Sequence, residues 1–441
     1  MKHRKIRKTD GNEQTYLRVP LVPVNWGHGR PWGGAQSPLF SFFPDDRYSL
    51  MESYGGDKRS FPRQRFWQVF LENRATILQK PRLKLGSPSV IAIIGVPMDV
   101  GVGYRHGARF GPRAIREASA QFGSGVEGGF DIREVEKKIV DLGDIEIHPY
   151  LLSQKFFNDK TLNEVRKSYG EEGDVPPLGL GNFERIQYTL EWILGEKPVA
   201  DRTKNDRAEY VILPKNRNPT RWRGNVFPVL LGGDHTLTLP CIRAMKKAYG
   251  GGGLGVICFD AHPDYLEKRS GLDETHASQG KRVAEEVGPE NLFQVGLGYI
   301  ESEERKNLDR DGVNYWRMDY LANKHADDFS DELCATLKAK RIRNIYISFD
   351  IDVLDASIAP GTGVPEPGGM TTRYLIDIIQ NLGDFIEKQS DLKLVGLDLV
   401  EVAPDWDIGN ITALAAVKII FETLGAYFIP EKTKIRSPKS K

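Results

Sequence analysis

Cysteine, net charge and long apolar segments are all scarce in this chain of 441 residues. Its only cysteines, Cys241, Cys258 and Cys334, are far apart and lie in apolar or helical contexts, which excludes a disulfide framework and a zinc-finger spacing. We expect three reduced, buried thiols. The formal net charge of +1 excludes the strong global field that is typical of proteins that bind nucleic acid or membrane surfaces, so neither partner is expected.

Hydrophobic segments that would direct the chain to a membrane are also missing from the pattern. We find no apolar stretch of membrane-spanning length, and the first residues, MKHRKIRK, lack the apolar centre of a secretory signal. The expected location is therefore the cytoplasm. Both tips are basic, and we interpret them as solvated ends.

The chain divides by composition into an arm, a main domain and a tail. The first 88 residues are rich in proline, glycine and aromatic residues, with one helix expected over 64–80. This region is too aromatic for a typical disordered tail, and we expect it to pack on the main domain or on a neighbouring subunit. The predicted division is an N-terminal arm over 1–88, a main domain over 89–428 with insertions near 152–182 and 198–225, and a basic tail over 429–441.

Short β-branched runs alternate with helical patterns throughout the main domain. Strands are predicted over 90–95, 139–143, 227–233, 254–260, 292–298, 313–317, 344–350 and 393–399. Helices are predicted near 112–121, 183–194, 238–249, 278–286, 329–339, 372–387 and 410–427. Apolar strands separated by helices indicate a parallel sheet that is covered on both faces. The predicted fold class is α/β, a three-layer αβα domain with an eight-stranded parallel sheet and an N-terminal extension.

Metal-ligating side chains follow three of these strands, and a glutamate, Glu401, follows a fourth. Because the carboxyl ends of parallel strands meet at one edge of a sheet, these side chains are expected to converge. A single aspartate in such a place is more often a helix cap, but three strand ends with such pairs exceed coincidence. The predicted metal ligands are two histidines and four aspartates: His235, Asp260, His262, Asp264, Asp350 and Asp352.

The chemistry of this ligand set favours a pair of divalent ions. A tetrahedral zinc site needs three or four ligands, whereas six nitrogen and oxygen ligands without sulfur suit two ions with bridging carboxylates. Mn(II) fits such ligands best, and nickel, cobalt and iron are chemically admissible. Two adjacent ions generate a hydroxide at neutral pH and polarise a planar electrophile, as in two-metal hydrolases.

Three motifs, LGGDHT, FDAHPDY and SFDIDVLD, resemble the metal-binding signatures of the ureohydrolases, the arginase and agmatinase family. The segments 95–119, 360–371 and 396–407 resemble the same family, so the similarity extends from about residue 89 to 428. The resemblance implies an arginase-like fold and hydrolysis of a guanidino compound to urea and an amine. It also implies two Mn(II) ions, or nickel in some members. The ligand roles that it implies are bridging by Asp260 and Asp350, one ion completed by His235 and Asp264, and the other completed by His262 and Asp352.

The resemblance also implies catalytic roles for three residues. A hydroxide that bridges the ions attacks the guanidinium carbon, and Asp264 steadies it through the tetrahedral intermediate. Glu401 pairs with the guanidinium in a charge-assisted contact. His276, in the stretch ETHAS, shuttles a proton to the leaving group or to water. Members of the family are commonly trimers or hexamers, so a homo-oligomer is expected.

The substrate is left open by the sequence. Residues 265–275 lack the asparagine and serine pattern with which arginases bind an amino-acid head group, so arginine is disfavoured. Lys268 and Arg269 would suit the carboxylate of a guanidino acid such as 4-guanidinobutyrate, whereas nearby acids would suit the ammonium group of agmatine: Glu267, Asp273 and Glu274. The arm and the 198–225 insertion would favour free guanidine if they cover the pocket mouth, or they build an oligomer interface.

Two other functions are compatible with part of the pattern. A metal-dependent deacetylase of similar fold shares an Asp-x-His segment, but it uses one zinc ion and has no need of His235 or of the second carboxylate of each pair. A catalytically inactive scaffold would need neither Glu401 nor His276.

Overall fold

The computed structural model describes the main domain and a few short segments outside it. The described residues are 90–119, 139–145, 181–194, 226–250 and 252–429, with 16–17, 21–22, 147, 158, 160 and 213–214. The predicted helix over 64–80, most of both insertions and the tail from residue 430 lie outside them.

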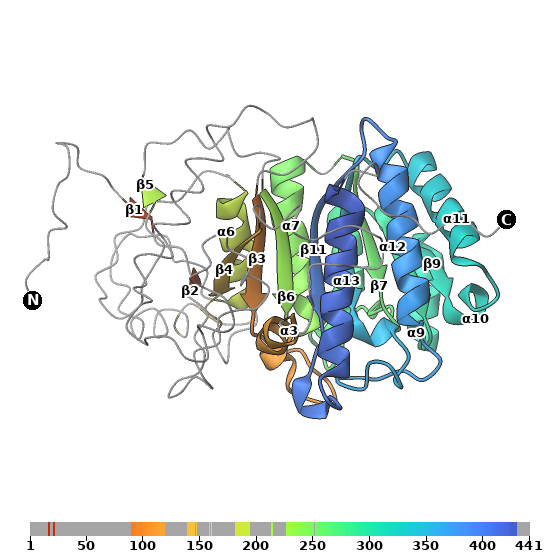
Figure 1. The fold of residues 1–441 in the computed structure, drawn as a ribbon. Helices are drawn as coiled ribbons and strands as arrows, with labels where there is room; N and C mark the ends of the chain where they lie inside the picture. The colour runs from red at the N-terminus through yellow and green to blue at the C-terminus, as the bar shows by residue number, and fades with distance from the viewer. Residues whose placement is uncertain are drawn as a thin grey trace, which may run out of the picture.

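A parallel sheet forms the centre of the described part of the chain (Figure 1). Its eight parallel strands are β3 (Val90–Val96), β4 (Ile139–Ile145), β6 (Val226–Gly232), β7 (Leu254–Phe259), β8 (Leu292–Leu297), β9 (Asn314–Arg317), β10 (Asn344–Asp350) and β11 (Lys393–Val400). Their order is β4-β3-β6-β11-β10-β7-β8-β9, and the two-residue β2 (Leu21–Val22) adds an antiparallel edge to β4. A separate ladder joins β1 (Tyr16–Leu17) to β5 (Leu213–Pro214). The predicted eight-stranded parallel sheet is confirmed.

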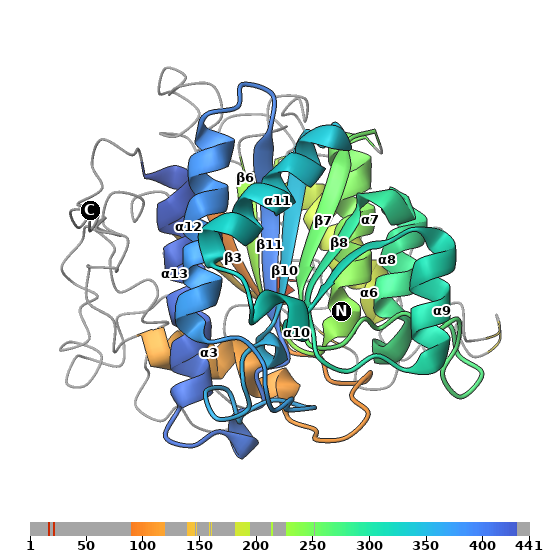
Figure 2. The same cartoon turned by 90° about the vertical axis from the view of Figure 1, so that its right-hand side faces the viewer.

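Helices cover both faces of this sheet, as the two views show (Figures 1 and 2). The helices are α3 (Gly111–Ser119), α6 (Asn182–Ile193), α7 (Thr238–Tyr249), α8 (Gln279–Val287), α9 (Ser302–Asp311), α10 (Met318–Leu321), α11 (Ala326–Ala339), α12 (Thr372–Glu387) and α13 (Ile411–Phe428). On one face α3, α13, α12 and α11 pack in sequence, and α6, α7 and α8 pack on the other. All seven helices predicted for the main domain are present, each within a few residues of its predicted bounds.

Two of the described helices, α9 and α10, were not predicted. The α9 sequence, SEERKNLDRD, has no apolar stripe, and only Glu304, Asn307 and Leu308 are buried in it. A capping box between Glu301 and Glu304 begins the helix, so local hydrogen bonding rather than an apolar face defines it. The four-residue α10 is too short to show a helical period.

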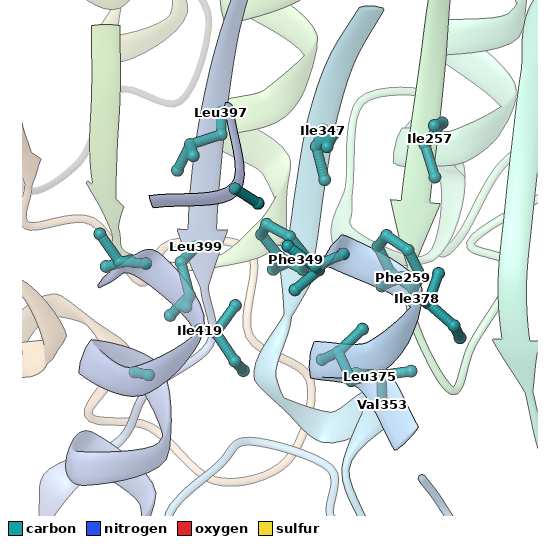
Figure 3. Close-up of a cluster of buried hydrophobic side chains, with 14 of the residues drawn as sticks. Ile257, Phe259, Ile347, Phe349, Val353, Leu375, Ile378, Leu397, Leu399 and Ile419 are labelled. Atoms are coloured by element: carbon teal, nitrogen blue, oxygen red, sulfur yellow. The ribbon is translucent and has the colours of Figure 1, made fainter. Parts of the chain in front are cut away.

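The strands are buried on both faces, which gives the domain one hydrophobic cluster on each side of the sheet. Toward α12 and α13, alternate residues of three adjacent strands point into a common cluster (Figure 3). Phe259 and Phe349 stack there with ring centroids 5.2 Å apart. All three cysteines are buried and free, as expected.

The expectation that the chain has no apolar stretch of membrane-spanning length is wrong. Among the described residues, α13 is long and apolar enough to cross a membrane by length and composition, with a mean hydropathy of 1.5. In the fold, 72% of this segment is buried, and the helix packs between α12 and α3. Its apolar character is therefore explained by its place as a core helix, since both neighbouring helices and the sheet surround it.

Candidate metal centre

The carboxyl ends of four adjacent strands, β6, β11, β10 and β7, bring the predicted site residues together. His235 follows β6 in a short 3-10 turn, and Glu401 follows β11 directly. Asp350 ends β10, and Asp260 comes directly after β7. Four neighbouring strands therefore bring together site residues that are far apart in the sequence.

The imidazole of His235 lies at the centre of the first half of this cluster. Its Nδ1 atom is 3.0 Å from Oδ2 of Asp260, 3.2 Å from Oδ2 of Asp350 and 3.6 Å from Oδ2 of Asp264. This buried nitrogen makes no hydrogen bond of acceptable geometry with any described residue. A nitrogen that faces three carboxylate oxygens without bonding to them fits a position where a cation is shared among all four groups.

The second half of the cluster forms around His262. Its Nδ1 atom lies 3.0 Å from Oδ2 of Asp352 and 3.8 Å from Oδ1 of Asp260. Asp260 thus directs one carboxylate oxygen toward each histidine. That arrangement suits a carboxylate that bridges two ions.

Backbone N–H groups fix the carboxylates that face the cluster. The N–H of His262 donates to Oδ1 of Asp260 at 2.7 Å, and the N–H of Asp352 donates to Oδ1 of Asp350 at 2.9 Å. The N–H of Ala261 donates to Oδ1 of Asp352 at 3.2 Å. One oxygen of Asp260 and one of Asp350 are therefore held by their own loops, and one oxygen of Asp352 is held by the loop after β7. Asp264 has a left-handed backbone, with φ of 50°, and its Oδ2 atom faces the same nitrogen of His235 as Oδ2 of Asp260 does.

The electrostatics of the cluster show an excess of buried negative charge. Burial and the neighbouring carboxylates raise the pKa of Asp260, Asp264 and Asp350. Burial alone would lower the pKa of His262, but Asp352 above all, with Asp260 and Asp264, raises it to about 11. Raised pKa values at these groups mean that, without a metal ion, the folded protein binds protons to offset the buried negative charge. Divalent ions supply positive charge there, so the donor set fits the metal pair.

Glu401 lies beside the cluster in a strained backbone conformation, with φ of 65°. Its Oε1 atom accepts a hydrogen bond from the backbone N–H of His235 at 2.8 Å. The other oxygen, Oε2, faces Gly363, where an added Cβ atom would lie only 3.0 Å away. Burial, followed by repulsion from Asp234, raises the pKa of Glu401 to about 8. A guanidinium group bound here would provide the missing counter-charge.

His276 begins a 3-10 turn after Thr275, on the segment that leads into α8. The loop after β3 approaches its ring so closely that a Cβ atom on Gly103 would lie 2.7 Å from Nε2. Burial and the positive charge of Arg269 lower its pKa below the ordinary value of 6.5. The ring is therefore neutral near pH 7, as a proton shuttle requires.

The charged side chains of the loop over 265–275 have partners of their own. Arg310 pairs with Glu267 at 2.9 Å, and Arg243 pairs with the buried Glu274 at 3.1 Å. Arg269 pairs with Glu301 at 2.8 Å. Glu267 and Glu274, two of the acids that would suit a distal ammonium group, are therefore neutralised within the protein.

Sequence reasoning missed the polar groups directly behind the ligands. Cys258 lies with Sγ 3.8 Å from Nε2 of His235, although no thiol was expected near the site. Ser348 lies 3.1 Å from the same nitrogen. A signal was available, because Cys258 and Ser348 each precede a predicted aspartate ligand by two positions and so share its face of the strand.

Comparisons with known proteins place this chain in one family. The chain matches the model of the arginase family over residues 89–425. It is 32% identical over 336 residues to an agmatinase of Bacillus cereus, covering 76% of this chain and 91% of that protein. It is 29% identical over 351 residues to the mitochondrial guanidino acid hydrolase of Homo sapiens, covering 78% and 79% of the two chains. The crystal structure of proclavaminate amidino hydrolase from Streptomyces clavuligerus is similar with a TM-score of 0.55 and 26% identity, over 80% and 96% of the chains.

The fold, the site and these matches define a hydrolase that acts on the C–N bonds of linear amidines. The chain belongs to the arginase family, whose members depend on a binuclear metal centre. The resemblance inferred from the sequence motifs is thereby confirmed. The role of each individual site residue stays a prediction.

Proposed function

We propose that this protein hydrolyses a guanidino compound to urea and an amine at a binuclear metal site. The observation that carries the proposal is the convergence of two histidines and four aspartates beside the buried carboxylate of Glu401. The deacetylase alternative would leave half of these ligands without a purpose. An inactive scaffold would leave Glu401 strained and buried without a cationic partner.

In this proposal Asp260 and Asp350 would contribute to holding both of two divalent ions, with Mn(II) the first candidate and Ni(II) the second. His235 and Asp264 would hold the first ion, and His262 and Asp352 would hold the second. When bound, two such ions act as Lewis acids and lower the pKa of water between them. The oxygen and nitrogen donors match Mn(II) because it prefers carboxylate ligands and tolerates imidazole.

The remaining steps belong to side chains of the protein. Glu401 binds the guanidinium group through two charge-assisted hydrogen bonds and orients its planar carbon toward the cluster. Asp264 accepts a hydrogen bond from the attacking water and holds it through the tetrahedral stage. His276, neutral at the start, takes up a proton on its imidazole ring and delivers it to the leaving amine.

The charged residues of the loop over 265–275 indicate which group the substrate carries at its far end, the end away from the guanidino group. Glu267 and Glu274 are engaged by Arg310 and Arg243. Arg269 is itself paired with Glu301, but its charge still reaches His276 and lowers the pKa of that ring. A distal ammonium group would meet this positive charge without a free acid from Glu267 or Glu274. We therefore favour a guanidino acid over agmatine, with free guanidine, which has no far end, as the second choice.

The test is urea release by purified protein that has been stripped of metal and reloaded separately with Mn(II) and Ni(II). The substrates are 4-guanidinobutyrate, 3-guanidinopropionate, agmatine, arginine and guanidine, each at matched concentration. A preference for a guanidino acid supports the assignment. A preference for agmatine would overturn the assignment of the far end, and no urea from any substrate with two ions bound would overturn the proposed reaction.

A further inference from the structure

A row of polar side chains crosses the sheet directly beneath the candidate metal centre. The strand register places Ser348 of β10 opposite Asp398 of β11 on one side and opposite Cys258 of β7 on the other. Each side chain of this row on β7 and β10 shares a face with the aspartate two residues further on, Asp260 or Asp350. The row is therefore the layer of the sheet that lies immediately behind the proposed ligands.

Asp398 is the centre of this layer and is completely buried. It accepts hydrogen bonds from three hydroxyl groups: Ser348 at 2.6 Å, Tyr346 at 2.8 Å and Thr238 of α7 at 2.9 Å. Three donors of this kind compensate an ionised carboxylate in an apolar environment. Only one of the three, Ser348, also contacts a proposed metal ligand, since its Oγ lies 3.1 Å from Nε2 of His235.

The direction of these hydrogen bonds determines which nitrogen of His235 carries a hydrogen. A serine hydroxyl has a single hydrogen, and the short contact to a carboxylate engages it. Toward His235, Ser348 is then only an acceptor, so Nε2 must be the donor. The thiol of Cys258 is a weaker partner at 3.8 Å. In the neutral ring Nδ1 keeps its lone pair, and it is Nδ1 that faces Asp260, Asp350 and Asp264.

We propose that Asp398, acting through Ser348, is a positioning residue that holds His235 in the Nε2–H tautomer and so reserves Nδ1 for a metal ion. The inference rests on the proposed function, because it assigns His235 to the metal site. Without the acceptor at Asp398, the hydroxyl hydrogen of Ser348 is free to turn toward Nε2. That arrangement favours the Nδ1–H tautomer, in which a hydrogen occupies the direction in which the ion would bind.

The first test compares metal affinity in matched variants. Ser348→Ala and Asp398→Leu break the relay, the hydrogen-bond chain from Asp398 through Ser348 to His235, because neither leaves an acceptor and a hydroxyl in place. Tyr346→Phe removes a donor to the same carboxylate without touching His235. Metal-free protein is titrated with Mn(II), and free ion is followed by electron paramagnetic resonance. We expect the two relay variants to bind one of the two ions about 10- to 100-fold more weakly, with the other ion little changed and Tyr346→Phe close to wild type.

A purely structural network predicts a different result. The three variants would then lose affinity equally, or both ions would be weakened together, and either result would overturn the proposal. Circular dichroism and the unfolding midpoint verify that each variant is folded. Ser348→Ala is the smaller change and decides the question by itself if Asp398→Leu does not fold.

A spectroscopic test reads the hydrogen bond from Nε2 of His235 to Ser348 directly. The chain has eight histidines, so selective ¹⁵N-histidine labelling of Zn(II)-loaded protein gives a tractable spectrum, and His235→Asn identifies the His235 signals by their loss. We expect a slowly exchanging Nε2–H proton for His235 in wild type and Tyr346→Phe, and a shifted, rapidly exchanging one in Ser348→Ala. An unchanged Nε2–H signal in Ser348→Ala would contradict the relay.

Failure of the proposed reaction and failure of the relay give different results. Wild-type protein that binds two ions but releases no urea would overturn the proposed reaction alone. The comparison of metal affinities among the variants would still decide the relay.

Discussion

Glu401 is the residue whose surroundings most directly indicate a cationic substrate. It is buried, has a strained backbone and has no basic side chain among its described hydrogen-bond and ion-pair partners. Its raised pKa, about 8, is explained by burial and by the nearby Asp234. A bound guanidinium group would restore the ionised form, so part of the substrate affinity is expected to come from this one carboxylate.

The first prediction concerns the variant Glu401→Gln. The amide keeps the hydrogen bond from the N–H of His235 but cannot form a charge-assisted pair with a guanidinium group. Because such contacts are worth about 1.5–3 kcal/mol, kcat/KM is expected to fall about 10- to 100-fold, with metal content unchanged. Steady-state urea kinetics and elemental analysis check this. The exposed variant Glu303→Gln on α9 is the matched control, and unchanged kinetics in Glu401→Gln would remove Glu401 from the guanidinium role.

The second prediction concerns the pH dependence of His276. Burial and Arg269 lower its pKa, and the nearby His262 acts in the same direction. In Arg269→Gln the positive charge is lost, so the pKa of His276 rises toward 6.5. The limb of the pH–rate profile that reports His276 should move to higher pH, whichever protonation state the reaction needs.

The measurement is kcat/KM against pH for wild type and Arg269→Gln at constant ionic strength. Arg305→Gln, which changes an exposed arginine on α9, serves as the control and should leave the profile in place. A limb that stays fixed in Arg269→Gln, or that moves to lower pH, would contradict the electrostatic assignment.

At the scale of elements, the site depends on two loops that approach the catalytic side chains without side chains of their own. Gly103, in the loop after β3, lies against the ring of His276, and Gly363, in the loop after β10, lies against Glu401. A methyl group at either position would meet these functional atoms at 2.7 and 3.0 Å. Glycine is therefore required there by close approach rather than by backbone conformation.

The third prediction follows for Gly103→Ala. The added methyl group must displace the ring of His276, and a displacement of this size in a catalytic group is expected to reduce kcat about 10-fold or more. The metal ligands lie on other loops, so the stoichiometry of bound metal should stay the same. Gly252→Ala, where an added Cβ meets no atom within 4 Å, is the control. Equal kcat values for the two variants would show that His276 tolerates the displacement or plays no part.

The helices and strands differ in how well the sequence predicts them. The strands and the main helices were predicted because continuous apolar runs and amphipathic periods report burial directly. Helix α9 was missed because its residues are nearly all polar, and its beginning depends on a capping box. The apolar length of α13 was overlooked, and its burial between two helices and the sheet is a tertiary property.

At the scale of the whole molecule, the metal site couples four neighbouring strands that are distant in sequence. Without cations, Asp260, Asp264 and Asp350 repel one another in a buried position. Metal binding removes that repulsion only in the folded chain, because the ligands are far apart when the chain is unfolded. Bound metal is therefore expected to stabilise the fold as a whole.

The fourth prediction is a rise in the unfolding midpoint on metal loading. Each ion held at a concentration 100-fold above its dissociation constant adds about 2.7 kcal/mol to the free energy of unfolding. Thermal unfolding of metal-free protein with and without Mn(II), and with added chelator, measures the effect. Asp260→Asn, which removes the carboxylate shared by both halves of the cluster, should show a smaller rise. Identical midpoints with and without Mn(II) would contradict a preformed site.

The sequence by itself determined the αβα class, the strand ends that carry ligands, and the family. These follow from local patterns, since the period of apolar residues, the chemistry of a strand end and a short motif are all written in neighbouring residues. Only the tertiary structure decided that Asp260 faces both histidines, that Glu267 and Glu274 are already paired, and that Asp398 reaches His235 through Ser348. Each of these depends on which strands and helices lie side by side, and that arrangement is fixed by the packing of the whole domain.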